Sequence, residues 1–260
     1  MDTPRRRLVV VACVLAAVLW PAAPAAAGVI VALGDSLTAG LGVAPDEAWP
    51  ARLQARLRGG GWDYRVVNAG VSGDTTAGGL RRLDWVLRAE PEVAIVALGA
   101  NDGLRGQSVA AMRANLRAIV DRLRARGVRV LLAGMRMPPN YGDAYTRAFA
   151  AAFGEVARGA GAALMPFLLE GVAAVPSLNQ ADGIHPNAEG HRIIADSIWA
   201  YVKPLLESPA RRPARDRRGG WAPASPTRPS ASLFPPPREG TRRPGDQRGG
   251  GAAGVPPSAG

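Results

Sequence analysis

Three residue types that together can activate a hydroxyl group lie at two distant places in the chain. Ser36 follows an apolar run over residues 29–33, and Asp182 precedes His185 by three positions. A serine hydroxyl is a poor nucleophile until a base removes its proton, and histidine is the side chain that titrates nearest to neutral pH. A carboxylate beside the imidazole orients it and stabilises its charged form. We therefore expect Ser36 to be a nucleophile, His185 its base and Asp182 the group that orients the base.

Hydrolysis of an acyl group also needs donors for the negative oxygen of the tetrahedral intermediate, and the sequence offers three. Gly73 has no side chain to block its N–H, and Asn101 carries a neutral NH₂ group. The backbone N–H of Ser36 would be the third donor, because it lies near a predicted helix N-terminus. Losing one such donor typically slows catalysis about 10²–10³-fold. Taken singly, each of these residues is also typical of an ordinary turn or cap; their combination in chain order predicts an oxyanion hole.

The elements that must position these residues alternate between short apolar runs and amphipathic segments. Such alternation predicts an α/β fold with a parallel sheet and right-handed crossovers. The polar groups follow strand ends, and in a parallel sheet these ends converge at one edge. Strands are predicted at residues 29–33, 64–68, 93–98, 128–133 and 162–167, and helices at 45–58, 80–87, 109–123, 144–157 and 188–206, the last burying Ile193, Ile194, Ile198, Tyr201 and Val202.

Other chemistries have little support in the sequence. The two histidines and single cysteine are too few for a protein-built zinc site, so we expect no metal and no cofactor. His191 lies inside the last predicted helix and is expected to be structural. The chain has no G-x-S-x-G elbow and no Gly-Lys-Ser/Thr phosphate loop, which disfavours an ordinary α/β-hydrolase and a nucleotide-binding enzyme.

The two ends of the chain differ in composition from its middle. Arg5–Arg7, an apolar stretch over residues 8–20 and the small residues ending at Ala27 are typical of a secretory signal peptide cleaved after Ala27. An uncleaved anchor is the alternative. Residues 208–260 are rich in Pro, Gly and Arg, so we expect a disordered tail. The sequence thus predicts a signal over residues 1–27, one domain over 28–207, and a secreted or periplasmic protein.

The charge of +11 is concentrated outside the predicted domain. Residues 208–260 carry +7 and residues 28–207 only +2. A near-neutral domain does not predict a nucleic-acid surface. The basic tail instead suggests loose contact with anionic envelope surfaces. We expect a monomer.

The motifs around these residues resemble those of the SGNH (GDSL) hydrolase family. They are Gly34-Asp35-Ser36-Leu37, Gly73, Gly99-Ala100-Asn101-Asp102 and Asp182-Gly183-Ile184-His185-Pro186. The similarity covers about residues 29–206 and extends to the bacterial periplasmic thioesterase, protease and lysophospholipase branch, through segments 72–75, 101–106 and 139–142. Ala100 is a departure, since that branch often has glycine there.

The resemblance implies a three-layer α/β/α fold with a flavodoxin-like five-stranded sheet of order 2-1-3-4-5. It also implies hydrolysis of acyl esters and thioesters, such as lysophospholipids, acyl-CoA or aryl esters, with Ser36, Asp182 and His185 as the triad and Gly73 and Asn101 as oxyanion donors. Leu104 and Tyr141, in loops at the expected rim, are our candidates for acyl contact; ordinary loop packing is the alternative. Two other functions stay open: a carbohydrate O-deacetylase on the same fold, and a non-catalytic envelope-binding module.

Overall fold

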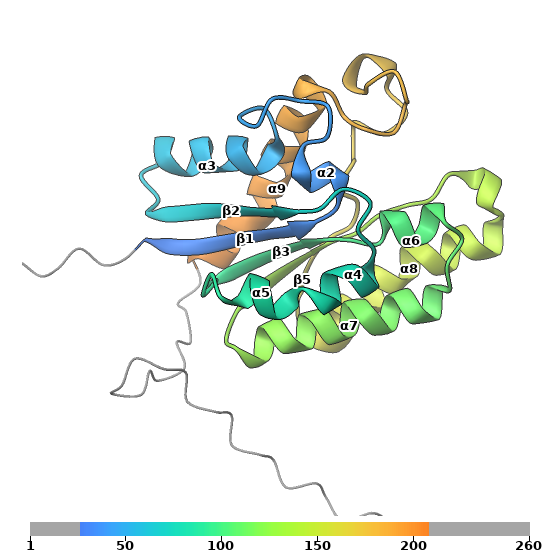
Figure 1. The fold of residues 1–260 in the computed structure, drawn as a ribbon, viewed down its shortest axis with the longest axis horizontal. Coiled ribbons are helices and arrows are strands. Elements are labelled where there is room, and N and C mark those ends of the chain that lie inside the picture. Colours follow the sequence, from blue (N-terminus) through green and yellow to red (C-terminus); the bar gives the residue numbers. More distant parts are fainter. Residues whose placement is uncertain (1–26, 208–260) are drawn as a thin grey trace, which may run out of the picture. The chain divides into compact units, whose positions relative to one another are not determined.

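A parallel sheet forms the centre of the structure, a computed structural model that describes residues 27–207. Its five strands run in the order β2-β1-β3-β4-β5, with helices on both faces (Figure 1). The three-layer architecture and the strand order predicted from the sequence are therefore confirmed. The predicted signal over residues 1–27, apart from Ala27, and the predicted tail over residues 208–260 lie outside the described residues. The strands are β1 (Gly28–Gly34), β2 (Tyr64–Gly70), β3 (Val93–Ala97), β4 (Arg129–Ala133) and β5 (Ala163–Met165).

The apolar run before Ser36 forms β1, which pairs with both β2 and β3. Leu33 lies opposite Ala69 on one side and Val96 on the other. Residues 30–34 are all buried, because helices cover both faces of the strand. This explains why the run does not alternate between apolar and polar residues. The nucleophile candidate therefore follows a strand that is buried on both faces.

Two helices cover one face of the sheet and four cover the other (Figure 1). The first face carries α3 (Trp49–Gly59) and α9 (Ala188–Glu207). The second carries α4 (Thr76–Arg81), α5 (Leu83–Leu87), α7 (Val109–Ala125) and α8 (Asp143–Ala160). Four short helices lie in loops: α2 (Ser36–Ala39), α6 (Ala100–Leu104), η1 (Pro139–Tyr141) and η2 (Pro176–Leu178). Within residues 27–207, none of the helices has the length and hydropathy needed to cross a membrane.

Four details differ from the sequence-based expectation. The helix expected from residue 45 begins at Trp49, with Pro50 in its first turn, where proline is well tolerated. The helix expected over 80–87 is interrupted at Arg82, which caps α4 and precedes α5. Asn101, predicted only to follow a strand end, lies on the short helix α6. Tyr201, expected to be buried, is 38% exposed, and Ile193 is only partly buried.

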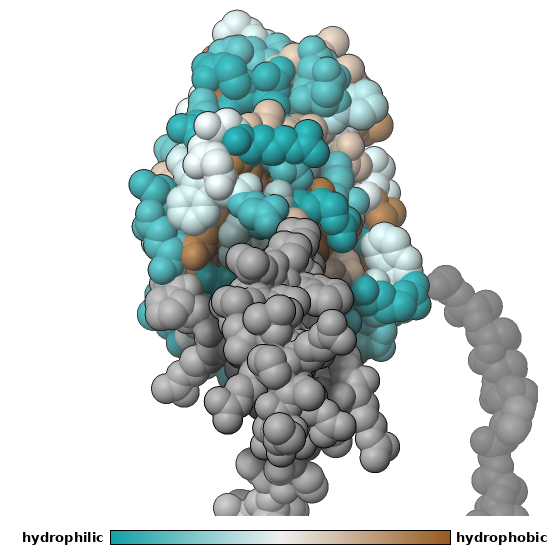
Figure 2. Space-filling view, turned by 90° about the vertical axis from the view of Figure 1, so that its left-hand side faces the viewer, coloured by the Kyte–Doolittle hydropathy of each residue, from teal (hydrophilic) through white to brown (hydrophobic). Residues whose placement is uncertain are grey.

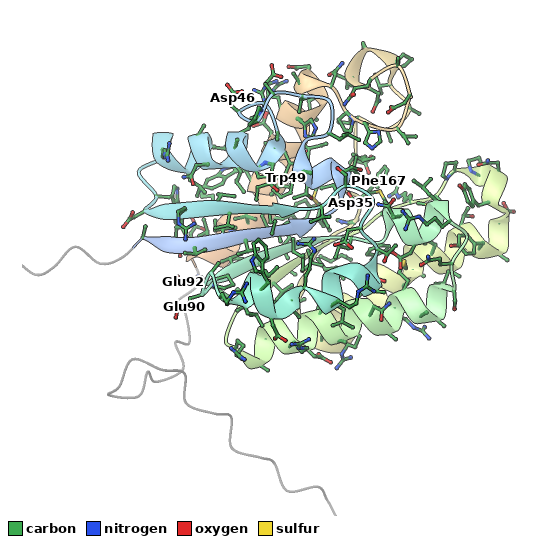
Figure 3. The ribbon with its side chains drawn as sticks, in the orientation of Figure 1. Asp35, Asp46, Trp49, Glu90, Glu92 and Phe167 are labelled. Carbon is green, nitrogen blue, oxygen red and sulfur yellow. The ribbon has the colours of Figure 1, made fainter. Side chains whose placement is uncertain are left out.

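The carboxyl ends of the strands all lie at one edge of the sheet, where the candidate residues also gather. Asp35 marks this edge, and Glu92, just before β3, marks the opposite one (Figure 3). The coloured surface at the end where the strands begin is mostly hydrophilic, with isolated hydrophobic residues (Figure 2). The carboxyl edge differs, because four of the exposed large apolar side chains lie on its loops: Leu41, Val71, Leu104 and Ile184.

Candidate active site

Ser36, His185 and Asp182 form a continuous hydrogen-bonded chain. Ser36 is the first residue of α2, and its Oγ lies 3.0 Å from His185 Nε2. His185 Nδ1 lies 2.7 Å from Asp182 Oδ2. With the Nδ1 proton donated to the carboxylate, Nε2 is left to accept the hydroxyl proton of Ser36. Two segments separated by 149 positions in the chain thus meet at hydrogen-bond distance.

Asp182 is held by the same short turn that presents His185. Its Oδ1 accepts hydrogen bonds from the backbone N–H groups of Ile184 and His185, both at 3.0 Å. Gly183 makes the turn at a φ of +72°, a conformation that glycine adopts at little cost. The backbone and ring hydrogen bonds from His185, with that from Ile184, lower the pKa of Asp182 to about 2. The carboxylate is therefore ionised throughout the neutral range and can stabilise an imidazolium.

Gln180 fastens the histidine loop to the serine loop. Its Nε2 donates to the carbonyl oxygen of Leu41, just after α2, at 2.7 Å and to that of Pro186 at 2.9 Å. Its backbone N–H also donates to the carbonyl of His185 at 2.8 Å. A side chain at Gly42 would collide with Gln180, since an added Cβ would lie 2.0 Å from Oε1. This contact joins the two halves of the triad and was not anticipated from the sequence.

The three expected oxyanion donors lie at the carboxyl ends of neighbouring strands. Ser36 follows β1, Gly73 follows β2 and Asn101 follows β3. Gly73 has a φ of +78° and is exposed, and its carbonyl oxygen accepts a hydrogen bond from Arg105 Nη2 at 3.0 Å. Asn101 Nδ2 donates to Asp35 Oδ2 at 3.3 Å, and an amide nitrogen carries a second N–H beyond the one used there.

Asp35 and Arg82 are polar residues that support this edge and that sequence reasoning missed. Asp35 is 1% exposed and caps α2, its Oδ1 accepting from the Leu37 N–H at 3.0 Å. Burial is the largest influence on this carboxyl and raises its pKa to about 6. Arg82 donates to the carbonyl oxygens of Gly34 at 2.9 Å and Ala69 at 2.8 Å, so it ties together the ends of β1 and β2. The sequence signal for Asp35 was its place in the Gly-Asp-Ser motif; Arg82 had no such signal.

The second histidine, His191, lies apart from the hydrogen-bonded chain. It is 1% exposed in the first turns of α9, and its Nδ1 accepts the backbone N–H of Trp49 at 3.3 Å. Burial lowers its pKa to about 4, so the imidazole is neutral at pH 7. A neutral ring that accepts a backbone N–H is a structural element between α9 and α3.

Leu104 and Tyr141, the two candidates for acyl contact, come from different segments and are joined by a hydrogen bond. Tyr141 donates its hydroxyl to the carbonyl oxygen of Leu104 at 3.0 Å. The Leu104 side chain is 41% exposed. Tyr141 stacks on Tyr145, which stacks on the buried Phe149, so Tyr141 is anchored to α8.

The family to which the chain belongs follows from comparison with known proteins. The model of the GDSL-like Lipase/Acylhydrolase family matches residues 32–193. The chain is a member of this family. The match includes Ser36, Gly73, Asn101, Asp182 and His185, and the resemblance seen in the motifs is confirmed.

Relatives of this GDSL-like hydrolase are named as an esterase, an arylesterase and a thioesterase/protease/lysophospholipase. Esterase TesA of Pseudomonas aeruginosa is 47% identical over 183 residues, covering 70% of this chain and 91% of that protein. Thioesterase 1/protease 1/lysophospholipase L1 of Escherichia coli is 40% identical, covering 70% and 86%. Arylesterase of Vibrio mimicus is 37% identical, covering 68% and 89%. The protein is therefore an enzyme, an ester hydrolase acting on small-molecule esters.

Solved structures of similar hydrolases share the fold. The crystal structure of TesA has a TM-score of 0.67 at 46% identity and covers 68% of this chain and 99% of that one. Esterase EstA from Pseudoalteromonas sp., in a structure inhibited by monoethylphosphonate, also has a TM-score of 0.67, at 36% identity, covering 70% and 100%. AlinE4, described as an SGNH-hydrolase family esterase, has a TM-score of 0.59 at 44% identity, covering 72% and 100%.

Proposed function

We propose that the protein hydrolyses acyl esters and thioesters through a covalent acyl intermediate on Ser36. The observation that carries this proposal is the unbroken sequence of contacts from Ser36 Oγ to His185 Nε2, 3.0 Å, and from His185 Nδ1 to Asp182 Oδ2, 2.7 Å. These are the distances over which a neutral imidazole removes a hydroxyl proton while a carboxylate stabilises the resulting charge.

The reaction follows from this arrangement in two halves. Ser36 Oγ attacks the acyl carbonyl carbon as His185 Nε2 takes the hydroxyl proton, and the carbonyl oxygen becomes an oxyanion. When the intermediate collapses, the bond to the alcohol or thiol breaks and His185 returns the proton to that leaving group. A water molecule then attacks the acyl-serine while His185 takes its proton. As the bond between the acyl carbon and Ser36 Oγ breaks, His185 returns the proton to Oγ, which releases the carboxylic acid and free Ser36.

The oxyanion would be bound by the N–H groups of Ser36 and Gly73 and by Asn101 Nδ2. Asp35 supports this role of Asn101, because the 3.3 Å contact between the two side chains orients the amide. Leu104 and Tyr141 would contact the acyl chain at the rim. The exposed apolar side chains on the surrounding loops suit an acyl chain better than a sugar, which favours an acyl hydrolase over a carbohydrate deacetylase.

The cellular setting is also a proposal. The charged, apolar and small-residue segments before Gly28 favour export of the enzyme with cleavage after Ala27, and so a periplasmic or secreted location. We propose a monomer whose basic tail makes loose contact with anionic envelope surfaces. Fractionation of cells and size-exclusion chromatography would test the location and the oligomeric state.

The function is tested with p-nitrophenyl butyrate and palmitoyl-CoA as substrates. Wild-type enzyme should hydrolyse both, while Ser36→Ala and His185→Ala should each lose about 10³-fold or more in kcat. Ser177→Ala is a matched control, because Ser177 lies on η2, outside the proposed triad. Wild-type turnover by the Ser36→Ala variant would refute the proposal. A wild-type protein that is inactive on every ester would instead favour a binding module.

A further inference from the structure

A buried carboxylate links the two segments that carry Gly73 and Asn101. Asp102, the residue after Asn101, is 2% exposed, and Thr76, in the first turn of α4, is fully buried. The Thr76 N–H donates to Asp102 Oδ2 at 2.9 Å, and the Thr76 hydroxyl donates to Asp102 Oδ1 at 2.6 Å. Both carboxylate oxygens of Asp102 therefore bind one residue of the neighbouring segment.

A third element fixes the Thr76 hydroxyl. Asn115, on α7, donates its Nδ2 to Thr76 Oγ1 at 3.1 Å. The hydroxyl thus accepts from Asn115 and gives its only hydrogen to Asp102, so its rotamer is determined from both sides. Buried polar groups with all their partners are rigid, and removing one partner leaves the others unsatisfied. The link is therefore a stiff connection between α4 and α6, braced on α7.

We propose that Asp102 and Thr76 are positioning residues that hold the oxyanion donors Gly73 and Asn101 at a fixed separation. This inference rests on the proposed function, because it assumes that those two residues bind the oxyanion. Gly73 lies three positions before Thr76 and Asn101 lies one before Asp102, so the link is attached close to both donors.

The link adds to single contacts that hold each donor segment, since Arg105 binds the carbonyl oxygen of Gly73 and Asp35 accepts from the Asn101 amide. Gly73 is exposed, and glycine has the most mobile backbone of any residue. Asn101 lies on a helix of only five residues. An oxyanion hole works through preorganisation, and a displacement of about 1 Å can cost about 10²-fold in rate. The two hydrogen bonds between Asp102 and Thr76 tie one donor segment to the other.

The sharpest test replaces the Thr76 hydroxyl with a methyl group of similar size. Thr76→Val removes the bond to Asp102 Oδ1, whereas Thr76→Ser keeps the hydroxyl and serves as the conservative rescue. Thr38→Val is the matched control. Thr38 is also fully buried, but within residues 27–207 its Oγ1 has no hydrogen-bond partner.

Two measurements separate positioning from a merely structural role. The first is kcat and KM for p-nitrophenyl butyrate, per active site counted with a fluorophosphonate. The second is the affinity for an alkyl trifluoromethyl ketone, whose serine adduct carries the oxyanion, compared with the affinity for the methyl ketone of equal chain length. Thr76→Val should lower kcat and trifluoromethyl ketone affinity about 10- to 100-fold, with KM and methyl ketone affinity within about twofold. Thr76→Ser and Thr38→Val should stay within about threefold of wild type.

The proposal is overturned if Thr76→Val lowers only the melting temperature and leaves kcat and trifluoromethyl ketone affinity unchanged. It also fails if Thr38→Val has the same effect as Thr76→Val. Should Thr76→Val not fold, Asp102→Leu, whose side chain is of similar size but accepts no hydrogen bond, gives the same readout, and an unchanged ketone affinity again overturns the proposal. Ser36→Ala tests the proposed function separately: residual wild-type activity there would remove the oxyanion assignment itself, whatever Thr76→Val shows.

Discussion

The buried carboxyl of Asp35 lowers the free energy of unfolding by an amount that can be measured as a pH dependence. The side chain is 1% exposed, and burial raises the pKa of its carboxyl from 3.8 to about 6. Its hydrogen bonds from Leu37 and Asn101 act in the opposite direction but do not cancel the burial. Above pH 6 the folded enzyme therefore holds an ionised carboxylate that would be better solvated in the unfolded chain. We predict that Asp35→Asn relieves this cost.

The magnitude follows from the two pKa values. The pKa of Asp35 is higher in the folded protein than in the unfolded chain. The stability that the protonated Asp35 carboxyl contributes is therefore present at low pH and is lost as pH rises through the folded pKa. Raising the pKa of Asp35 from 3.8 to about 6 lowers the free energy of unfolding at pH 8 by about 3 kcal/mol. About 2 kcal/mol of this should develop between pH 4.5 and pH 8.

The assay is urea unfolding of wild type and Asp35→Asn over that pH range. Asparagine keeps the acceptor for Leu37 N–H but loses the contact with Asn101, which costs about 1 kcal/mol independently of pH. Only the pH dependence of the difference is therefore diagnostic. Other titrating groups, such as His191, are present in both proteins and cancel. The free energy of unfolding of Asp35→Asn relative to wild type should rise by about 2 kcal/mol from pH 4.5 to pH 8.

The reasoning on Asp35 is refuted if this difference is flat across the range. It is also refuted if wild type gains stability over the variant as pH rises, since that would mean a carboxylate favoured by its surroundings rather than penalised by burial.

Two further results are expected. Leu104→Trp should shift the preferred acyl length in a series of p-nitrophenyl esters, and an unchanged profile would remove Leu104 from the acyl site. His191→Gln should lose less stability than wild type as pH falls from 7 to 4. The reason is that the lowered pKa of His191 contributes stability that is present above pH 6.5 and lost on acidification. Equal losses of both proteins in urea unfolding would contradict this.

The sequence was sufficient for the parts of the fold that depend on local pattern. The uninterrupted apolar run before Ser36 predicted a strand covered on both faces, and the turn Asp182-Gly183 predicted a carboxylate beside His185. Both features are local, because burial of a strand and the reach of a side chain over three residues leave signatures in neighbouring positions. Strand order followed from the family resemblance rather than from pattern.

The contacts that assemble the site could not be found in this way. Gln180 binds Leu41 across 139 positions, and Arg82 binds Gly34 across 48. The residues next to Gln180 and Arg82 in the sequence do not indicate these contacts, because a glutamine or arginine that binds a distant carbonyl oxygen has no different sequence pattern from one on the surface. The break between α4 and α5 also falls at Arg82, whose side chain binds the carbonyl oxygens of Gly34 and Ala69. Long-range hydrogen bonds to carbonyl oxygens produce no periodic pattern in the sequence.

The most direct test of a serine activated by His185 is covalent labelling with a fluorophosphonate. Intact-mass spectrometry should show one added phosphonyl group on wild type, peptide mapping should place it on Ser36, and the labelling rate should fall about 10³-fold or more in His185→Ala. Labelling at another residue, or a labelling rate unchanged in His185→Ala, would contradict the account.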